Sequence, residues 1–232
     1  EEEIDAFRRK HMHFRSVREY FIKKAREEGN TQEEIRLLNQ SREQDADSLA
    51  LVHLYTQRLI EIYQGLGDLE KEKAERREAL MRHPMTTLDD FKVYKSLCGR
   101  EEWEKAREDI IRARQDEGKK AEFLAEENML EELYQLICQQ KDIIGYLDKY
   151  GFLLADLYPE QILEQYEAYV CSIAEKARNR SWYDELLRYL RRMQQYRGGR
   201  EVVEKLCRKW ILAYPTRKVL VSELGRMLRE QK

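Results

Sequence analysis

The chain has 232 residues, of which 38% are charged and 42% hydrophobic, and it contains only three prolines and ten glycines. This composition is typical of long solvated helices, and the length allows one large domain or an elongated array. No run approaches the roughly 18 apolar residues of a membrane helix, and the acidic opening EEEIDAF is unlike a signal peptide. We therefore expect a cytoplasmic protein with no membrane partner and, because the initiator Met is missing, a fragment of a longer one.

Charge is distributed unevenly along the sequence. Residues 176–232 contain sixteen Lys and Arg against six Asp and Glu, a net of +10, and the total of −2 therefore leaves −12 for residues 1–175. Such an uneven distribution bears on partners rather than on the fold. The basic C-terminal part is therefore the first place to expect a binding surface.

The first predicted helices cover residues 2–65. An apolar stripe predicts one long helix over residues 2–28 that ends at Gly29, and Asn30 with Glu34 predicts a capping box for the second helix. The polar run QSREQDAD then predicts a break. A third helix, over about residues 46–65, is expected to bury a stripe made of Leu49, Val52, Leu54, Leu59 and Tyr63.

Residues 59–84 show the clearest helix–turn–helix pattern. Apolar residues recur at spacings of three and four up to Leu66, Gly67 supplies the left-handed residue that ends the helix, and Asp68 caps the next one. This second helix ends before Pro84, which cannot continue it. Because one hairpin cannot cover its own apolar face, the pattern predicts neighbouring hairpins.

The same helix–Gly–helix plan recurs farther along the chain. Thr87 and Asp90 are expected to cap a helix that Gly99 closes, and a second helix follows over residues 100–113. Gly99 lies 32 residues after Gly67, which is close to the period of about 34 residues in helical-repeat proteins.

The remaining sequence also predicts helices. Residues 119–140 indicate a short pair, residues 142–158 two short buried helices, and Pro159 the start of a longer one. Ser181 with Asp184 is expected to cap the next helix, and two more helices follow. No segment alternates with period two for long enough to predict a strand. We therefore expect an all-α fold of about ten to twelve helices in consecutive antiparallel pairs.

Two groups of side chains are predicted to lie in the core. Aromatic anchors are expected where large rings fall on the apolar stripes, at Trp103, Tyr166, Trp182 and Trp210. Free thiols of a reduced compartment are expected at Cys98, Cys138, Cys171 and Cys207.

The hairpin resembles a tetratricopeptide repeat. Residues 59–84 depart from that repeat at Ile60 and Glu72, where it has small residues, and match it at Leu59, Tyr63, Gly67, Asp68, Leu69, Ala79 and Pro84. The resemblance implies hairpins stacked as a TPR-like, right-handed α-solenoid. It implies one helical-repeat domain over 1–232, with N-terminal hairpins 1–84 and C-terminal hairpins 85–232 as the alternative division.

A longer resemblance covers roughly residues 85–227. The phrases YKSLCGREEW, LYPEQILEQYEAYV and WYDELLRYLRRMQQYRGGREVVEKLCRKWILAYPTRKVLVSELGRM are similar to the helical region of bacterial SWIM zinc-finger proteins. That family resembles DNA- or protein-binding factors, and some members accompany helicase-like ATPases. The finger needs a CxC pair followed by CxH, and neither is present here, so the resemblance assigns no zinc ligand.

The sequence contains no recognisable catalytic or metal-binding motif. His11 and His13 are two residues apart and would diverge on a helix, so a solvated face is the better interpretation. No activated nucleophile, glycine-rich phosphate loop or paired-acid motif is present. We therefore expect no enzyme, no cofactor and no metal, with folding independent of a metal ion.

Two rows of basic residues are the candidate binding residues. They fall opposite the apolar stripes of the helices predicted over 181–196 and 200–213, and they are Arg188, Arg191, Arg192, Lys205, Arg208 and Lys209. We expect all six to be exposed and the two rows to lie side by side. The alternative is that they are ordinary surface charge or pair with the acidic part of the chain.

Two functions fit these patterns. The first is a non-catalytic scaffold, part of a larger SWIM-type protein, that binds a protein or peptide partner. The second is a nucleic-acid accessory module whose basic rows contact phosphates without reading sequence.

Overall fold

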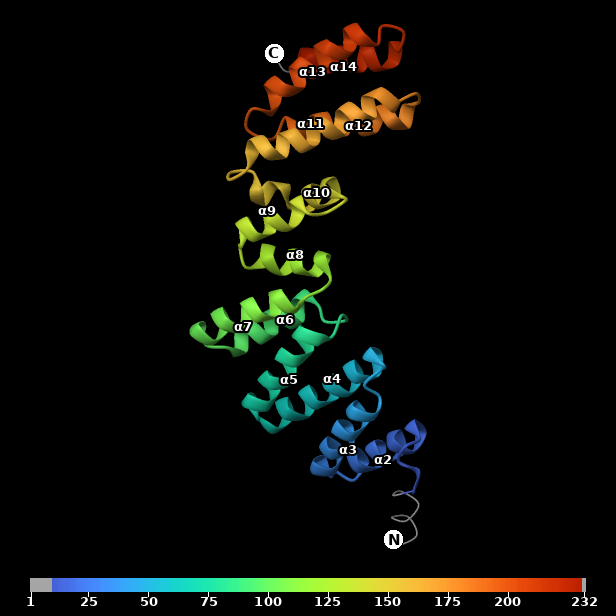
Figure 1. Ribbon diagram of the computed structural model, residues 1–232, viewed down its shortest axis with the longest axis vertical. Coiled ribbons are helices and arrows are strands. Elements are labelled where there is room, and N and C mark those ends of the chain that lie inside the picture. The colour runs from blue at the N-terminus through green and yellow to red at the C-terminus, as the bar shows by residue number, and fades with distance from the viewer. Residues whose placement is uncertain (1–9, 231–232) are drawn as a thin grey trace. The chain divides into compact units, whose positions relative to one another are not determined.

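The computed structural model describes residues 10–230, and over that range the chain is all-helical (Figure 1). These residues form thirteen helices and no strand, which confirms the all-α prediction and exceeds the ten to twelve helices expected. The helices are α2 (Arg15–Glu27), α3 (Thr31–Gln44), α4 (Leu49–Leu66), α5 (Leu69–Arg82), α6 (Leu88–Leu97), α7 (Arg100–Ala113), α8 (Glu117–Glu126), α9 (Leu130–Cys138), α10 (Ile143–Leu154), α11 (Pro159–Lys176), α12 (Arg180–Met193), α13 (Gly199–Ala213) and α14 (Lys218–Glu230).

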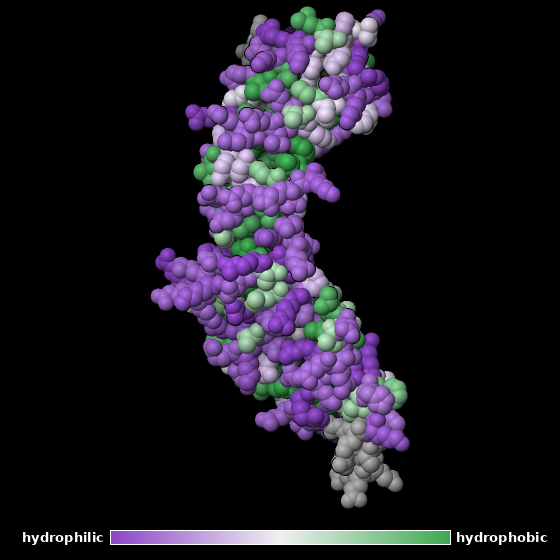
Figure 2. Space-filling view, viewed as in Figure 1, coloured by the Kyte–Doolittle hydropathy of each residue, from purple (hydrophilic) through white to green (hydrophobic). Residues whose placement is uncertain are grey.

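The chain divides into two compact units. Unit 1 extends to Phe123 and unit 2 begins at Leu124, so the boundary lies within α8. Hydrophilic side chains cover most of the visible face of each unit, with hydrophobic side chains showing between the helices (Figure 2). Each unit therefore has the exposed polar faces and buried apolar faces expected of packed amphipathic helices.

Unit 1 is built by packing each helix on its neighbours in the sequence. Helix α2 packs on α3, α3 on α4, α4 on α5, and α5 on both α6 and α7. One core cluster joins Phe21 of α2, Leu37 of α3, and Leu59 and Tyr63 of α4. Apolar stripes at helical spacing are therefore buried against the preceding and following helices rather than in a central core.

The turn between α4 and α5 confirms the predicted hairpin. Gly67 has a φ of +69°, the left-handed conformation that only glycine adopts without strain. The Asp68 side chain accepts a hydrogen bond from the backbone N–H of Lys71 at 3.2 Å, which caps α5. Leu66, expected on the apolar face, is exposed because the helix ends there and no neighbour covers it.

The second half of unit 1 centres on stacked aromatic rings. Thr87 and Asp90 form the predicted capping box of α6. The Phe91 ring stacks on Phe123 with centroids 4.1 Å apart and meets Trp103 edge-on at 4.9 Å. Trp103 is buried, so its prediction as a core anchor is confirmed.

A buried arginine holds the turn between α5 and α6. Arg114 follows α7 and donates to the His83 carbonyl at 2.9 Å and to Thr86 Oγ1. Lys119 Nζ donates to the Thr86 carbonyl at 2.8 Å and to the Pro84 carbonyl. These bonds satisfy carbonyl groups that a helix end would otherwise leave unpaired. The turn is therefore fixed by residues about 30 positions away.

Unit 2 uses the same local packing. Helix α9 packs on α10, α10 on α11, α11 on α12 and α13, and α14 on α12 and α13. Tyr166, Leu186 and Trp210 are buried in this unit, so Tyr166 and Trp210 are confirmed as core residues. Trp182 is 39% exposed, and Tyr183 is buried beside it. The prediction that Trp182 is a core anchor is therefore wrong.

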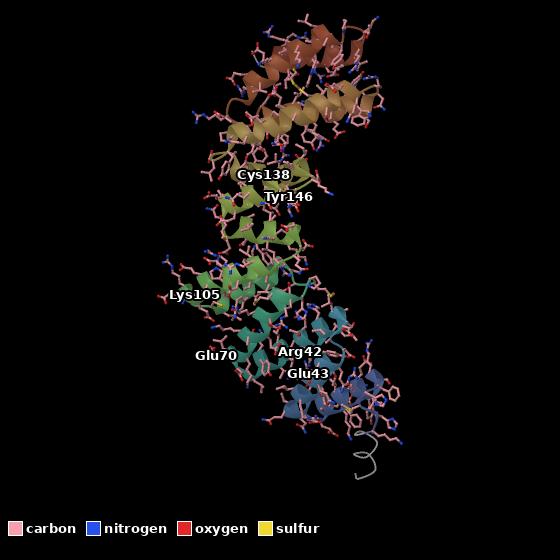
Figure 3. The ribbon with its side chains drawn as sticks, viewed as in Figure 1. Arg42, Glu43, Glu70, Lys105, Cys138 and Tyr146 are labelled. Carbon is pink, nitrogen blue, oxygen red and sulfur yellow. The ribbon has the colours of Figure 1, made fainter. Side chains whose placement is uncertain are left out.

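Four further predictions are wrong. The helix expected over 2–28 is interrupted at 12–14, and residues 2–9 lie outside the described range. Residues 143–154 form the single helix α10 instead of two helices. Asn179 caps α12 by accepting from the Trp182 backbone N–H, in place of Ser181 with Asp184. Of the four cysteines expected in the core, only Cys207 is buried, and Cys138 is exposed because it ends a helix (Figure 3).

A buried histidine in unit 1 makes stability depend on pH. His83 is 3% exposed, its Nε2 lies 3.5 Å from Thr56 Oγ1, and the His53 ring centroid is 5.8 Å away. Burial, followed by the neighbouring His53, lowers the pKa of His83 below 6.5. The folded chain therefore binds a proton at His83 less readily than the unfolded chain does.

We expect the free energy of unfolding to decrease as the pH falls through 6.5, because the unfolded chain then takes up a proton that the folded chain resists. The stabilisation from neutral His83 is fully present above pH 6.5 and is lost below its folded pKa. Urea unfolding at pH 7.5 and pH 5.5 measures the change. His83→Gln should show a smaller loss between the two pH values, whereas an equal loss would assign the effect to other groups.

Candidate functional site

The predicted basic residues lie on α12 and α13, and most are exposed. The α12 row consists of Arg188, Arg191 and Arg192, and the α13 row consists of Lys205, Arg208 and Lys209. Five of the six are exposed, whereas the Arg192 side chain is only 23% exposed. The prediction that all six are exposed is therefore wrong for Arg192.

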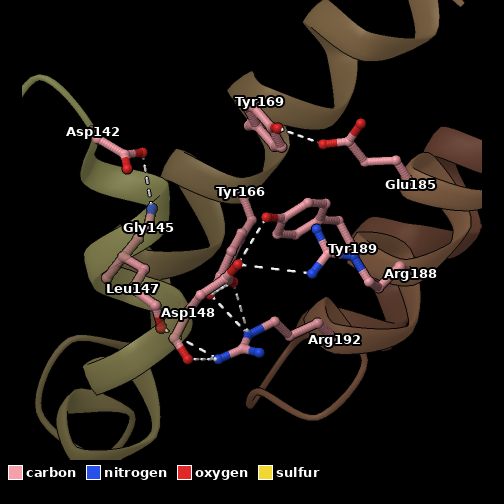
Figure 4. A network of polar contacts seen from close by, with 10 residues as sticks. All are labelled: Asp142, Gly145, Leu147, Asp148, Tyr166, Tyr169, Glu185, Arg188, Tyr189 and Arg192. Carbon is pink, nitrogen blue, oxygen red and sulfur yellow. Dashed lines mark hydrogen bonds and ion pairs between the residues drawn. The ribbon is translucent and has the colours of Figure 1, made fainter. Parts of the chain in front are cut away.

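Arg192 is held by a network that connects α12 with α10 and α11 (Figure 4). Its Nη2 donates to the Asp148 carbonyl at 2.5 Å and its Nε donates to Tyr166 Oη at 2.9 Å. The same Nε lies 3.4 Å from Asp148 Oδ1, and Tyr189 Oη donates to Asp148 Oδ2 at 2.8 Å. Arg192 therefore fastens α12 to the preceding helices, and most of its hydrogen-bonding capacity is used inside the protein.

The network also changes the acidity of its members. Burial raises the pKa of Tyr189, and the hydrogen bond to Asp148 raises it further, because an ionised phenol would lie beside a carboxylate. Burial alone would lower the pKa of Arg192, but Tyr166 and Asp148 raise it overall. Both side chains therefore stay in their ordinary protonation states at neutral pH, as a structural contact requires.

Two other arginines of the rows are exposed but already paired. The Arg188 guanidinium lies 4.3 Å from the centroid of the Tyr189 ring and 3.9 Å from Asp148 Oδ2. Arg208 pairs with Glu204 one turn earlier on α13 at 2.6 Å. Such exposed pairs contribute little to stability, and the arginines can exchange them for an external anion.

Three cations of the rows are exposed and have no ion pair with residues 10–230: Arg191, Lys205 and Lys209. The rows have different neighbours, since Arg188 and Arg192 approach Asp148 on α10, whereas Lys209 acts electrostatically on Cys171 of α11. Helices α12 and α13 pack on each other, and the side-by-side arrangement of the two rows stays a prediction.

Unit 1 contains a groove that the sequence did not predict. This α4 groove has a volume of about 440 Å³, and its lining combines four apolar residues, Ala46, Leu49, Val52 and Ala74, with five polar ones, Arg42, Glu75, Glu78, Arg82 and His83. Its rim carries two internal ion pairs, one between Arg42 and Glu75 at 2.5 Å (Arg42 is labelled in Figure 3) and one between Arg82 and Glu78 at 2.8 Å. The four charges at the rim form two pairs of opposite sign, so they leave no net charge there. Leu49, Val52 and Ala74 provide apolar surface in the groove.

The sequence contained an indication of this groove. Leu49 and Val52 belong to the stripe predicted to face the core, yet Leu49 is 53% exposed. The polar run before them places the start of α4 at the surface, whereas the later part of the stripe, at Leu59 and Tyr63, is buried in the cluster with α2 and α3. The indication of a groove in the sequence was an apolar residue in the first turn of a helix that follows a polar break.

Two findings bear on the described thiols and acids. Within residues 10–230, no three His, Cys, Asp or Glu side chains are grouped so that they could hold a metal ion. Burial raises the pKa of Cys207 to about 12 and also raises the pKa of Cys98 and Cys171, which disfavours the nucleophilic thiolate. No helix in this range has the length and apolarity needed to cross a bilayer.

We expect Arg192→Ala to lower the free energy of unfolding by about 1–3 kcal/mol, because it leaves the Asp148 carboxylate and carbonyl without their partner. The adjacent Arg191→Ala, at an exposed position without an ion pair, should change it by less than about 0.5 kcal/mol. Urea unfolding of both variants measures the difference. Equal effects would contradict the structural role assigned to Arg192.

Comparison with known proteins identifies no relative of this chain. No family model matches the chain, and neither the curated proteins nor the solved structures contain a match to it. The resemblances to SWIM zinc-finger proteins and to tetratricopeptide repeats therefore stay predictions.

Proposed function

We infer that this protein is a non-catalytic, TPR-like helical-repeat scaffold that binds a protein or peptide partner. Local packing supports the proposal, because the main contacts between helices within a unit join helices one or two places apart in the chain, as in α-solenoids. Such folds present extended surfaces rather than one enclosed site. The phrases similar to SWIM proteins support a place for the scaffold inside a larger protein of that kind.

The observation that carries this proposal is the α4 groove. Leu49 is exposed there beside Val52 and Ala74, so an incoming apolar side chain would remove all three from water. Burial of apolar area stabilises a contact by roughly 25 cal/mol per Å². The paired charges at the rim add no repulsion for either sign of partner. A peptide with an aliphatic or aromatic anchor is therefore the occupant that the groove favours.

We expect peptides selected from a displayed library against the full chain to lose at least about tenfold in affinity on Leu49→Asp, since a carboxylate on the groove floor must be desolvated beside an apolar anchor. Leu54→Asp is the matched control, because Leu54 lies on the same helix, is 60% exposed and does not line the groove. Fluorescence anisotropy with labelled peptides gives the dissociation constants. Peptides whose affinity does not change on Leu49→Asp would exclude the α4 groove as the binding site.

A second candidate function is contact with nucleic acid. The observation that favours it is the set of exposed cations without an ion pair on α12 and α13, at Arg191, Lys205 and Lys209. Charges free of internal partners can neutralise phosphates and release counterions, which gives binding that depends on salt and little on sequence. Arg192 is left out of this set because the network in Figure 4 uses it.

We expect Arg191→Glu, Lys205→Glu and Lys209→Glu together to abolish any binding to duplex DNA, and each lost phosphate contact to lower the salt slope by about one unit. Lys176→Glu, Lys218→Glu and Arg229→Glu give the same change in net charge from other exposed positions of unit 2. Electrophoretic shifts at two salt concentrations measure both sets. Absence of binding to DNA or RNA at low salt would reject this second function.

A further inference from the structure

A second groove lies in unit 2, between the first half of α11 and the turn that joins α12 to α13. This α11 groove has a volume of about 500 Å³. Pro159 and Leu163 of α11 and Val202 of α13 provide its apolar lining, and Arg197 and Gly198 of the turn close it on the other side. Figure 1 shows α11 and α13 in the same unit, and the two helices pack on each other directly.

Two glycines give the groove its shape. Gly198 adopts a φ of +79°, and a Cβ there would lie 4.0 Å from Leu163 Cδ1, so the turn rests on α11. A Cβ on Gly199 would lie only 1.8 Å from the Met193 carbonyl oxygen. The chain therefore reverses tightly enough to bring the start of α13 beside α11, and the wall of the groove is fixed by backbone rather than by movable side chains.

Carboxylates line one wall of the groove. Glu160, Glu164 and Glu167 lie at spacings of four and three on α11, so they share one face of the helix. None of the three makes an ion pair or side-chain hydrogen bond with residues 10–230, and Arg197 is the one cation among the lining residues. Three carboxylates against one guanidinium leave the groove with a formal charge of −2.

Several other carboxylates of unit 2 pair with an arginine instead. Asp148 pairs with Arg192, Asp184 with Arg180, and Glu204 with Arg208. Unpaired carboxylates along a groove with an aliphatic floor are complementary to a cation on an apolar stem, and Lys and Arg side chains have that form.

We propose that the α11 groove binds a peptide segment in which Lys or Arg residues alternate with aliphatic residues, the cations meeting the glutamates and the aliphatic side chains covering Pro159 and Val202. This inference rests on the proposed scaffold function and adds a second site with a defined partner chemistry. A nucleic acid is disfavoured here, because its phosphates would meet three carboxylates.

The test uses the full chain and two labelled ten-residue peptides of equal charge, one alternating Lys with Leu and the other Lys with Ser. Fluorescence anisotropy at 0.15 M salt should show the Lys–Leu peptide binding at least tenfold more tightly than the Lys–Ser peptide. Glu160→Gln, Glu164→Gln and Glu167→Gln together should weaken the Lys–Leu peptide at least tenfold. Equal binding of both peptides would mean a diffuse attraction to acidic surface and would overturn the proposal.

The matched control removes the same charge elsewhere on unit 2. Glu131, Glu132 and Glu175 are exposed and lie outside the groove, so their replacement by Gln should change binding less than twofold. Val202→Lys places a cation on the groove floor and should abolish binding of the Lys–Leu peptide. A control that weakens binding as much as the groove variant, or an unaffected Val202→Lys, would overturn the proposal. Circular dichroism confirms that each variant is folded.

The binding tests of the two grooves can give different outcomes. Leu49→Asp changes only the α4 groove and should leave the Lys–Leu peptide bound as before. If the library peptides depend on Leu49 while the Lys–Leu peptide shows no dependence on the α11 glutamates, the scaffold function stands and this inference fails. If neither groove binds a peptide, both fail together.

Discussion

Local packing is the constraint on which both units depend. The main contacts between helices within a unit join helices one or two places apart in the sequence. Each apolar stripe is therefore covered by helices close to it in the chain, while Arg114 and Arg217 reach carbonyl groups at more distant helix ends. Turns and helix ends therefore decide the architecture, and large rings such as Trp103 and Trp210 fill the space between successive helices.

Arginine side chains connect helices that a central core would hold together in a globular domain. Arg18 reaches from α2 to Gln44 and Asp45, Arg114 holds the turn after α5, and Arg192 connects α12 with α10. Arg217, before α14, donates to the Ala174 carbonyl near the end of α11 at 2.5 Å. A guanidinium offers five donors on a long stem, so it can satisfy several acceptors on a neighbour at once.

The same residue type therefore serves two purposes that composition cannot separate. Arg191 and Arg192 are adjacent in the sequence, yet the first is exposed without an ion pair and the second is built into a polar network. Counting positive charge along 176–232 overstates what is available to a partner, because Arg192 and Arg217 already bind acceptors within the protein.

The sequence predicted what is determined locally. Gly67, Asp68 and the Thr87–Asp90 capping box act within a few residues, and the structure confirms each of them. Two helices were expected over residues 142–158, but Gly151 lies inside the single helix α10, and a Cβ there would come within 2.5 Å of Tyr196 Oη, 45 residues later. Glycine is required there by a tertiary contact, which cannot be recognised from local sequence spacing.

The candidate sites were less predictable for the same reason. Trp182 and Tyr183 are neighbours at the start of α12, and either could have continued the apolar stripe, so only the adjacent helices decide which ring is buried. The partner of Arg192 lies 44 residues earlier, at Asp148. The α4 groove is lined by residues of α3, α4 and α5 together, and periodicity along one helix cannot reveal such an arrangement.

The preference for contacts between helices close in the sequence has an evolutionary consequence. A helix pair that packs mainly on its neighbours in the chain can be duplicated or deleted with few interfaces to rebuild. Length in such a chain is therefore free to drift between related genes, and a change in length alters how far the surface extends without altering the fold.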